Sequence, residues 1–162
     1  DRTVGINHNP SAKFLSDLHD STGIAIPTKP GVDSVRAVKS MRGGTAKVFL
    51  SMGGNFVSAM SDTNATASAL SNCSITAQIS TKPNRSHLVT GRTALILPCL
   101  GRSEKDHTSV GEQFVSVENS MGIVHSSRGS SKPASEMLRS EPSIVSGIAG
   151  ALDTRIGRSG IA

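Results

Sequence analysis

The fold of this chain is constrained most strongly by one stretch of sequence. In it, a predicted strand leads directly into two glycines, and a predicted helix and a second strand follow. Residues 47–52, KVFLSM, predict a strand buried on both faces of a parallel sheet, because the apolar run is continuous. The glycine loop, residues 53–55, follows at once. A helix is expected to begin at residues 62–64 and to end near Asn72, and residues 74–79 alternate apolar and polar side chains as a strand does. This order indicates an α/β fold with a parallel sheet and flanking helices.

Caps, prolines and apolar spacing predict the remaining elements. Before the glycine loop we expect an extended segment over residues 1–9, a helix capped by Asn9 and ended at Thr22-Gly23, an irregular stretch over 24–32, and a helix from Asp33 or Ser34 to Gly43. After residue 80 we expect a short turn or helix at Leu88-Val89, a strand over 94–97, short strands near 114–117 and 123–124, a helix opening at Ser140, and a frayed tail over 157–162.

These elements predict three regions along the chain. Residues 1–100 form a partial Rossmann-like half-domain, residues 101–139 a loop and short-strand region, and residues 140–162 a C-terminal helix and tail.

Composition narrows the function classes. The net charge of +5 favours a phosphate-bearing partner. The absence of Trp and Tyr, with only four Phe, argues against single-stranded nucleic acid, because its bases stack on exposed aromatic rings, and we expect no nucleic-acid partner. No apolar run reaches the roughly 18 residues of a membrane span. Cys73 and Cys99 are expected to be buried, reduced thiols in a cytoplasmic protein.

A second candidate segment is the polar loop, residues 80–87, which follows the second predicted strand. Its hydroxyl, amide, imidazole and cationic side chains suit a diphosphate or a nucleotide. In a parallel sheet, both loops lie at the same rim, where α/β folds bind ligands. The alternatives are a plain turn for the glycine loop and a solvated loop here. The polar side chains are those of Ser80, Thr81, Lys82, Asn84, Arg85, Ser86 and His87.

The sequence contains no motif of several other common kinds of functional site. The five histidines are scattered, so we expect no zinc site. No standard NTPase loop, dinucleotide fingerprint or hydrolase elbow is present. Residues 104–107, EKDH, are interpreted as a solvated charged turn, with acid/base work as the alternative.

Three longer segments stand out in combination: VFLSMGGNFVSA (48–59), ISTKPNRSHLVTGRTALILPCLGRSEKD (79–106) and GEQFVSVENSMGIVHSSRG (111–129). Together with the opening DRTVGIN, they resemble the molybdopterin-dependent oxidoreductases, and among these the formate-dehydrogenase-like alpha subunits. The resemblance covers about residues 1–150 and implies an interior piece of an enzyme of several hundred residues.

The resemblance also implies a cofactor, molybdenum bis(molybdopterin guanine dinucleotide), whose guanine dinucleotide arm the two loops would hold. The implied binding residues are Gly53, Gly54, Asn55, Ser58, Ser80, Thr81, Lys82, Asn84, Arg85 and His87. Ser80 and Thr81 stand where an acidic residue often reads guanine, so the resemblance implies contacts to phosphate and ribose. The parent often carries an iron-sulfur cluster, but two cysteines cannot supply its about four ligands. No metal ligand and no catalytic residue is assigned in this chain.

The implied partners are the rest of the alpha subunit, a small substrate such as formate, and a redox partner. We expect the chain alone to be inactive, since the cofactor supplies the chemistry. Two alternatives stay open: a stand-alone nucleotide- or phosphate-binding α/β module, and a structural or interaction domain without a ligand.

Overall fold

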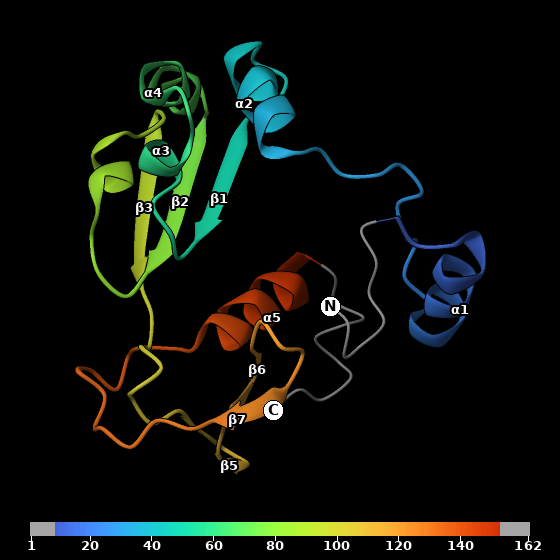
Figure 1. Cartoon of the computed structure of the whole chain (residues 1–162), viewed down its shortest axis with the longest axis vertical. Helices are drawn as coiled ribbons and strands as arrows, with labels where there is room; N and C mark the ends of the chain where they lie inside the picture. Colours follow the sequence, from blue (N-terminus) through green and yellow to red (C-terminus); the bar gives the residue numbers. More distant parts are fainter. Residues whose placement is uncertain (1–8, 153–162) are drawn as a thin grey trace.

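A parallel three-stranded sheet organises the N-terminal part of the chain, and its strand order is β1-β2-β3 (Figure 1). The computed structural model describes residues 9–152, so the extended segment expected over 1–9, apart from Asn9, and the tail lie outside the described residues, as does His8. The strands are β1 (Val48–Met52), β2 (Ile75–Ser80) and β3 (Thr93–Pro98), and both pairings are parallel. The predicted α/β fold with a parallel sheet is confirmed.

The connections between these strands carry helices that lie on one face of the sheet (Figure 1). Helices α3 (Phe56–Ala59) and α4 (Thr63–Ser71) join β1 to β2, and the 3₁₀ helix η1 (Arg85–Leu88) lies between β2 and β3. Helix α2 (Ser34–Arg42) precedes β1 and packs beside α4. Because crossovers between parallel strands are right-handed, a strand order that advances in one direction places them on one face.

The core lies between this face and its helices. Met41, Val57, Ala69, Leu70 and Cys73 form a buried cluster. The rings of Phe49 and Phe56 pack against it with their centroids 5.0 Å apart. The core therefore rests on aliphatic and sulfur-containing side chains with one aromatic pair.

The prediction that β1 is buried on both faces was wrong. Val48 and Leu50 are 61% and 49% exposed, while Phe49 between them points into the core. The physical reason is topological: β1 is an edge strand, and every crossover of the sheet lies on the Phe49 side.

Helix caps explain most boundaries. The carboxylates of Asp33 and Asp62 accept hydrogen bonds from Arg36 N and Ala65 N, as the sequence predicts for α2 and α4. The predicted turn at Leu88-Val89 is one turn of 3₁₀ helix that begins earlier, at Arg85. Helix α3 was not predicted, because four residues give no periodic pattern.

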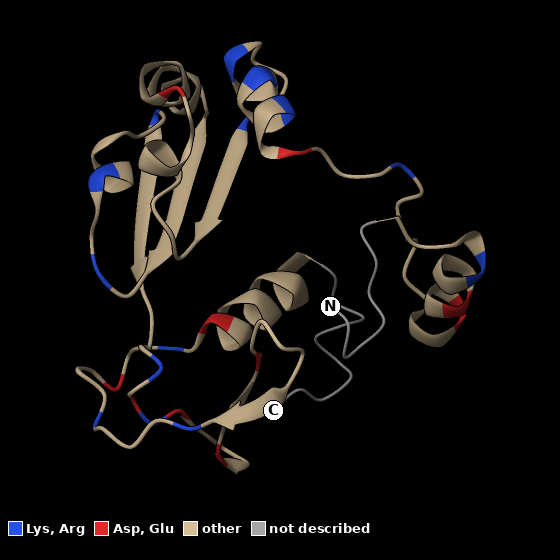
Figure 2. Ribbon diagram, in the orientation of Figure 1, with Lys and Arg blue, Asp and Glu red and all other residues tan. Residues whose placement is uncertain are grey.

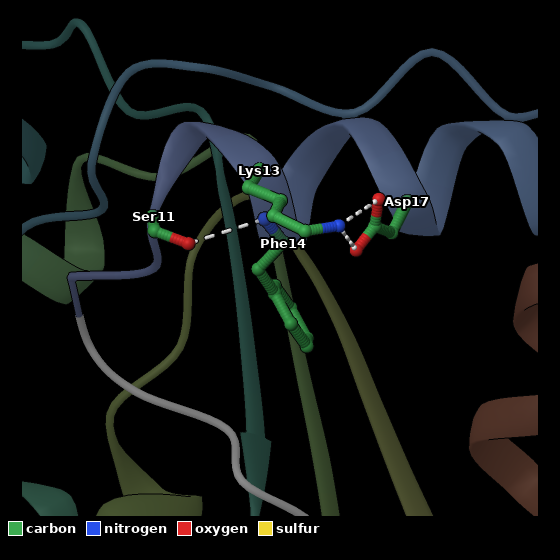
Figure 3. Close-up of polar contacts among 4 residues, drawn as sticks. All are labelled: Ser11, Lys13, Phe14 and Asp17. Atoms are coloured by element: carbon green, nitrogen blue, oxygen red, sulfur yellow. Dashed lines mark hydrogen bonds and ion pairs between the residues drawn. The ribbon is translucent and has the colours of Figure 1, made fainter.

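Helix α1 (Ala12–Thr22) lies apart from the sheet and buries no residue (Figure 1). The predicted cap, Asn9, was wrong: the Ser11 hydroxyl accepts from Phe14 N at 3.2 Å (Figure 3). Lys13 and Asp17 form an ion pair one turn apart on its surface, with their closest atoms 2.8 Å apart (Figure 3). Gly23, with φ of 67°, ends the helix as predicted.

The C-terminal part is less regular, as predicted. It contains two antiparallel hairpins and a helix: β4 (His107–Thr108) with β5 (Gly111–Glu112), β6 (Val115–Glu118) with β7 (Val124–Ser127), and α5 (Glu141–Leu152). The β6–β7 pair and α5 were predicted, whereas the two-residue strands β4 and β5 were not. No helix within residues 9–152 combines the length and the hydropathy needed to cross a bilayer.

Candidate functional site

The glycine loop and the polar loop meet at one rim of the sheet, as the sequence predicts. Gly53 N donates to Ile79 O at 2.8 Å, which continues the β1–β2 ladder past the end of β1. The side-chain nitrogen of Asn84, Nδ2, donates to Gly54 O at 2.7 Å, although 30 positions separate the two residues. The two loops therefore form one hydrogen-bonded unit at the carboxyl ends of β1 and β2.

Ser86 is the central side chain of this unit. Its hydroxyl donates to Asn55 Oδ1 at 2.9 Å and accepts from Val57 N at 3.0 Å. Its carbonyl accepts from the side-chain amide of Gln78 on β2 at 2.8 Å. Ser86 is 1% exposed, so these bonds replace solvent and fix the loops to each other and to the sheet.

His87 closes the polar loop locally. Its Nδ1 accepts from Asn84 N at 2.9 Å, and the Asn84 side chain accepts from Ser86 N at 2.9 Å. An Nδ1 that accepts places the proton of a neutral imidazole on Nε2. That Nε2 atom is buried and has no hydrogen-bond partner among the described residues. A buried donor of this kind favours an acceptor from outside the described residues.

The backbone conformation of the glycine loop requires glycine at two positions. Gly53 and Gly54 have φ of 62° and 65°, a left-handed conformation that L side chains rarely adopt. A Cβ at Gly54 would meet no atom within 4 Å, so the space beside the loop is open. The two glycines therefore do turn the chain, as the alternative interpretation holds. The open space beside Gly54 still leaves room for a ligand.

The structure places the remaining predicted residues around this unit. Lys82 and Arg85 are exposed, and within residues 9–152 neither forms an ion pair with a carboxylate. The Ser80 hydroxyl donates to Lys82 O at 2.8 Å and shapes the turn. Thr81 and Ser58 are exposed and lie in the polar loop and in α3. The rim thus consists of two loops joined by hydrogen bonds, with the cationic side chains of Lys82 and Arg85 exposed on its surface.

Sequence reasoning missed one acidic group at the rim. A carboxylate oxygen of Glu141, the first residue of α5, lies 3.6 Å from the place a Cβ on Gly53 would occupy. Nothing near Glu141 in the sequence signals this approach, since it depends on how α5 packs.

In the charged segment 104–107, backbone N–H groups of two loops bind the side chain of Glu104. The Glu104 carboxylate accepts from Gly101 N and from Ala134 N, both at 2.7 Å. These backbone bonds, with that from Gly101 first, lower the pKa of Glu104 below its ordinary value. Glu104 therefore ties two distant loops together, and a carboxylate with both oxygens so engaged is poorly suited to carry protons.

Both cysteines are free and buried, as predicted. Burial raises the pKa of the Cys73 thiol. Burial, followed by the carboxylates of Glu141 and Glu104, raises the pKa of Cys99. Both thiols are consequently protonated and unreactive at neutral pH. Within the described part of the chain, no three His, Cys, Asp or Glu side chains cluster as a metal site would require.

Comparison with known proteins finds close relatives of greater length. An uncharacterized oxidoreductase of Mycobacterium bovis is 51% identical over 152 residues, which are 94% of this chain and 20% of that protein. An uncharacterized oxidoreductase of Mycobacterium tuberculosis matches equally. Protein YdeP of Escherichia coli K12 is 46% identical over 149 residues, 92% of this chain and 20% of its own length.

The chain thus spans about a fifth of the length of the curated relatives it matches. No family model matches it.

Proposed function

We propose that this chain is part of the alpha subunit of a molybdopterin-dependent, formate-dehydrogenase-like oxidoreductase. In this proposal the glycine loop and the polar loop hold the guanine dinucleotide arm of its molybdenum cofactor. The observation that carries the proposal is the bonded rim, in which Asn84 and Ser86 fasten the polar loop to Gly54 and Asn55. The name oxidoreductase, borne by close relatives, supports the parent enzyme.

The residues at the rim fit such an arm in charge and shape. Lys82 and Arg85 are exposed cations, and Arg can bind a phosphate through two hydrogen bonds at once. The open space beside Gly54 allows a phosphate or a ribose to approach the backbone. His87, which closes the polar loop through its bond from Asn84 N, keeps these groups in place.

The bound cofactor would supply two-electron redox chemistry for a small substrate such as formate. This chain's own residues would do the positioning. Lys82 and Arg85 would neutralise the diphosphate, while Ser86 would keep the loops in a fixed geometry through its bonds to Asn55 and Val57. On this account the chain supplies part of a cofactor cradle and none of the reacting groups.

The test is the cofactor content of the longer polypeptide, measured as the guanine nucleotide that acid hydrolysis releases per polypeptide. We expect Arg85→Ala to reduce this content several-fold, because a charge-assisted contact to phosphate contributes about 1.5–3 kcal/mol. Lys82→Ala should reduce it less, since Lys binds phosphate as a point charge.

Two matched controls lie at the opposite end of the strands. Arg92, which donates to the Ser74 hydroxyl at 3.0 Å, precedes β3, and Lys47 precedes β1. Arg92→Ala and Lys47→Ala should leave the nucleotide content unchanged. Equal losses in the rim variants and the controls would show a general effect of charge and refute the proposed site.

A further inference from the structure

The second face of the sheet is apolar and open. Within residues 9–152 it consists of alternate residues of the three strands, which in-register parallel pairing places side by side. Ala77 and Ile79 lie in its middle and are buried. We call this surface the open sheet face, and its exposed large side chains are those of Val48, Leu50, Met52, Ile75, Leu95 and Leu97.

The chemistry of this face is that of a protein interior. None of the three strands carries a charged side chain (Figure 2). Leu50 and Leu95 are 49% and 47% exposed, and register places them on either side of Ala77. Contiguous apolar patches of this kind mark places where another surface packs. Parallel sheets in particular are found with both faces covered.

The topology shows that the β1–β3 unit cannot cover this face itself. Both crossovers lie on the opposite face, and α2 packs there beside α4. After β3 the chain leaves the sheet and enters the hairpins of the C-terminal part (Figure 1). Within residues 9–152, the helices that join or precede these strands therefore leave this face uncovered.

We infer that helices from the rest of a longer polypeptide pack on the open sheet face. This inference shares with the proposed function the premise that the chain belongs to a longer protein, as its curated relatives do. Helices fit better than a second copy of this sheet, because face-to-face sheet packing is characteristic of antiparallel sandwiches, whereas parallel sheets carry helices.

The width of the open sheet face indicates how many helices are needed to cover it. Strands about 4.8 Å apart make the sheet about 10 Å wide from β1 to β3, and a helix with its side chains is about 10–12 Å across. One or two amphipathic helices with uncharged aliphatic stripes are therefore enough.

The experiment is maleimide labelling of single cysteines introduced into the longer polypeptide. Leu50→Cys and Leu95→Cys place the thiol in the middle of the open sheet face. Thr93→Cys places it at the edge of this face, and we expect this variant to fold because Thr and Cys are nearly equal in size. Ser68→Cys on the exposed side of α4 is the control. We expect the face positions to react at least about tenfold more slowly than Ser68→Cys, because packed positions react only after local opening.

Equal labelling rates in the folded protein would overturn the inference. Protection that disappears on dilution would also overturn it, since it would identify a second copy as the cover. Labelling of polypeptide stripped of cofactor, and of the Arg85→Ala variant, separates this inference from the proposed function. Failure of cofactor binding alone leaves the protection of the face unchanged.

Discussion

Ser86 shows how a single hydroxyl can determine the geometry of a site. Its two side-chain bonds, to Asn55 Oδ1 and from Val57 N, are both buried. We predict that Ser86→Ala destabilises the protein by about 1–3 kcal/mol, because the substitution leaves buried polar groups without partners. Chemical denaturation measures this. Ser68→Ala, at an exposed position, should change stability by less than about 0.5 kcal/mol, and equal effects would contradict the role given to Ser86.

The hydrogen bonds of Glu104 should make the stability of the two loops that it joins depend on pH. Its pKa is lowered from 4.5 by bonds from Gly101 N and Ala134 N. A carboxyl whose folded pKa is depressed contributes stability above its unfolded pKa and loses it as the pH falls through the folded value. We therefore expect faster hydrogen exchange at Ala134 as the pH is lowered below about 4.5, after correction for the intrinsic rate. Glu104→Gln should abolish that dependence, and its persistence in the variant would contradict the assignment.

At the scale of elements, the helices differ in what stabilises them. Helix α1 buries no residue, so its cap and its surface ion pair carry much of its stability. Ser11→Ala should weaken α1 by about 1 kcal/mol, and Lys13→Ala should weaken it less, because an exposed ion pair one turn apart contributes about 0.2–0.5 kcal/mol. Amide exchange should quicken in α1 and stay constant in α4. Matching changes in α4 would show that α1 is coupled to the core.

Elements with a strong local signal were predictable from the sequence. The Asp33 and Asp62 caps, the Gly23 terminator and the apolar strands all act within a few residues. The start of α1 was missed because Asn9 and Ser11, on either side of Pro10, are both good caps, and only the backbone decides between them. Two-residue strands such as β4 have no periodicity to detect.

The candidate site was predictable only in outline. Parallel topology brings the glycine loop and the polar loop to one rim, and this followed from the order of strands. The bonds from Asn84 to Gly54 and from Ser86 to Asn55 connect residues about 30 positions apart, which no local pattern encodes. The approach of Glu141 to Gly53 depends on packing between distant parts of the chain in the same way.

At the scale of the whole molecule, one face of the sheet is covered and the other is open. A stand-alone module would be expected to cover both faces of a parallel sheet. The exposure of Leu50 and Leu95 therefore favours a part of a longer protein over that alternative. The rim loops, by contrast, are joined to each other and to the sheet by hydrogen bonds of Asn84 and Ser86, so their relative geometry does not depend on the cover of the open sheet face.

Hydrogen exchange of the longer polypeptide, measured before and after extraction of the proposed molybdenum cofactor, tests whether the rim loops bind that cofactor. We predict that bound cofactor slows exchange in two segments of this chain, residues 53–57 and 81–87, and leaves exchange in β6 and β7 unchanged. Loss of cofactor should return the two segments to faster exchange together, because Asn84 and Ser86 join them. Slowing confined to the C-terminal hairpins, or no change at the rim, would contradict the account.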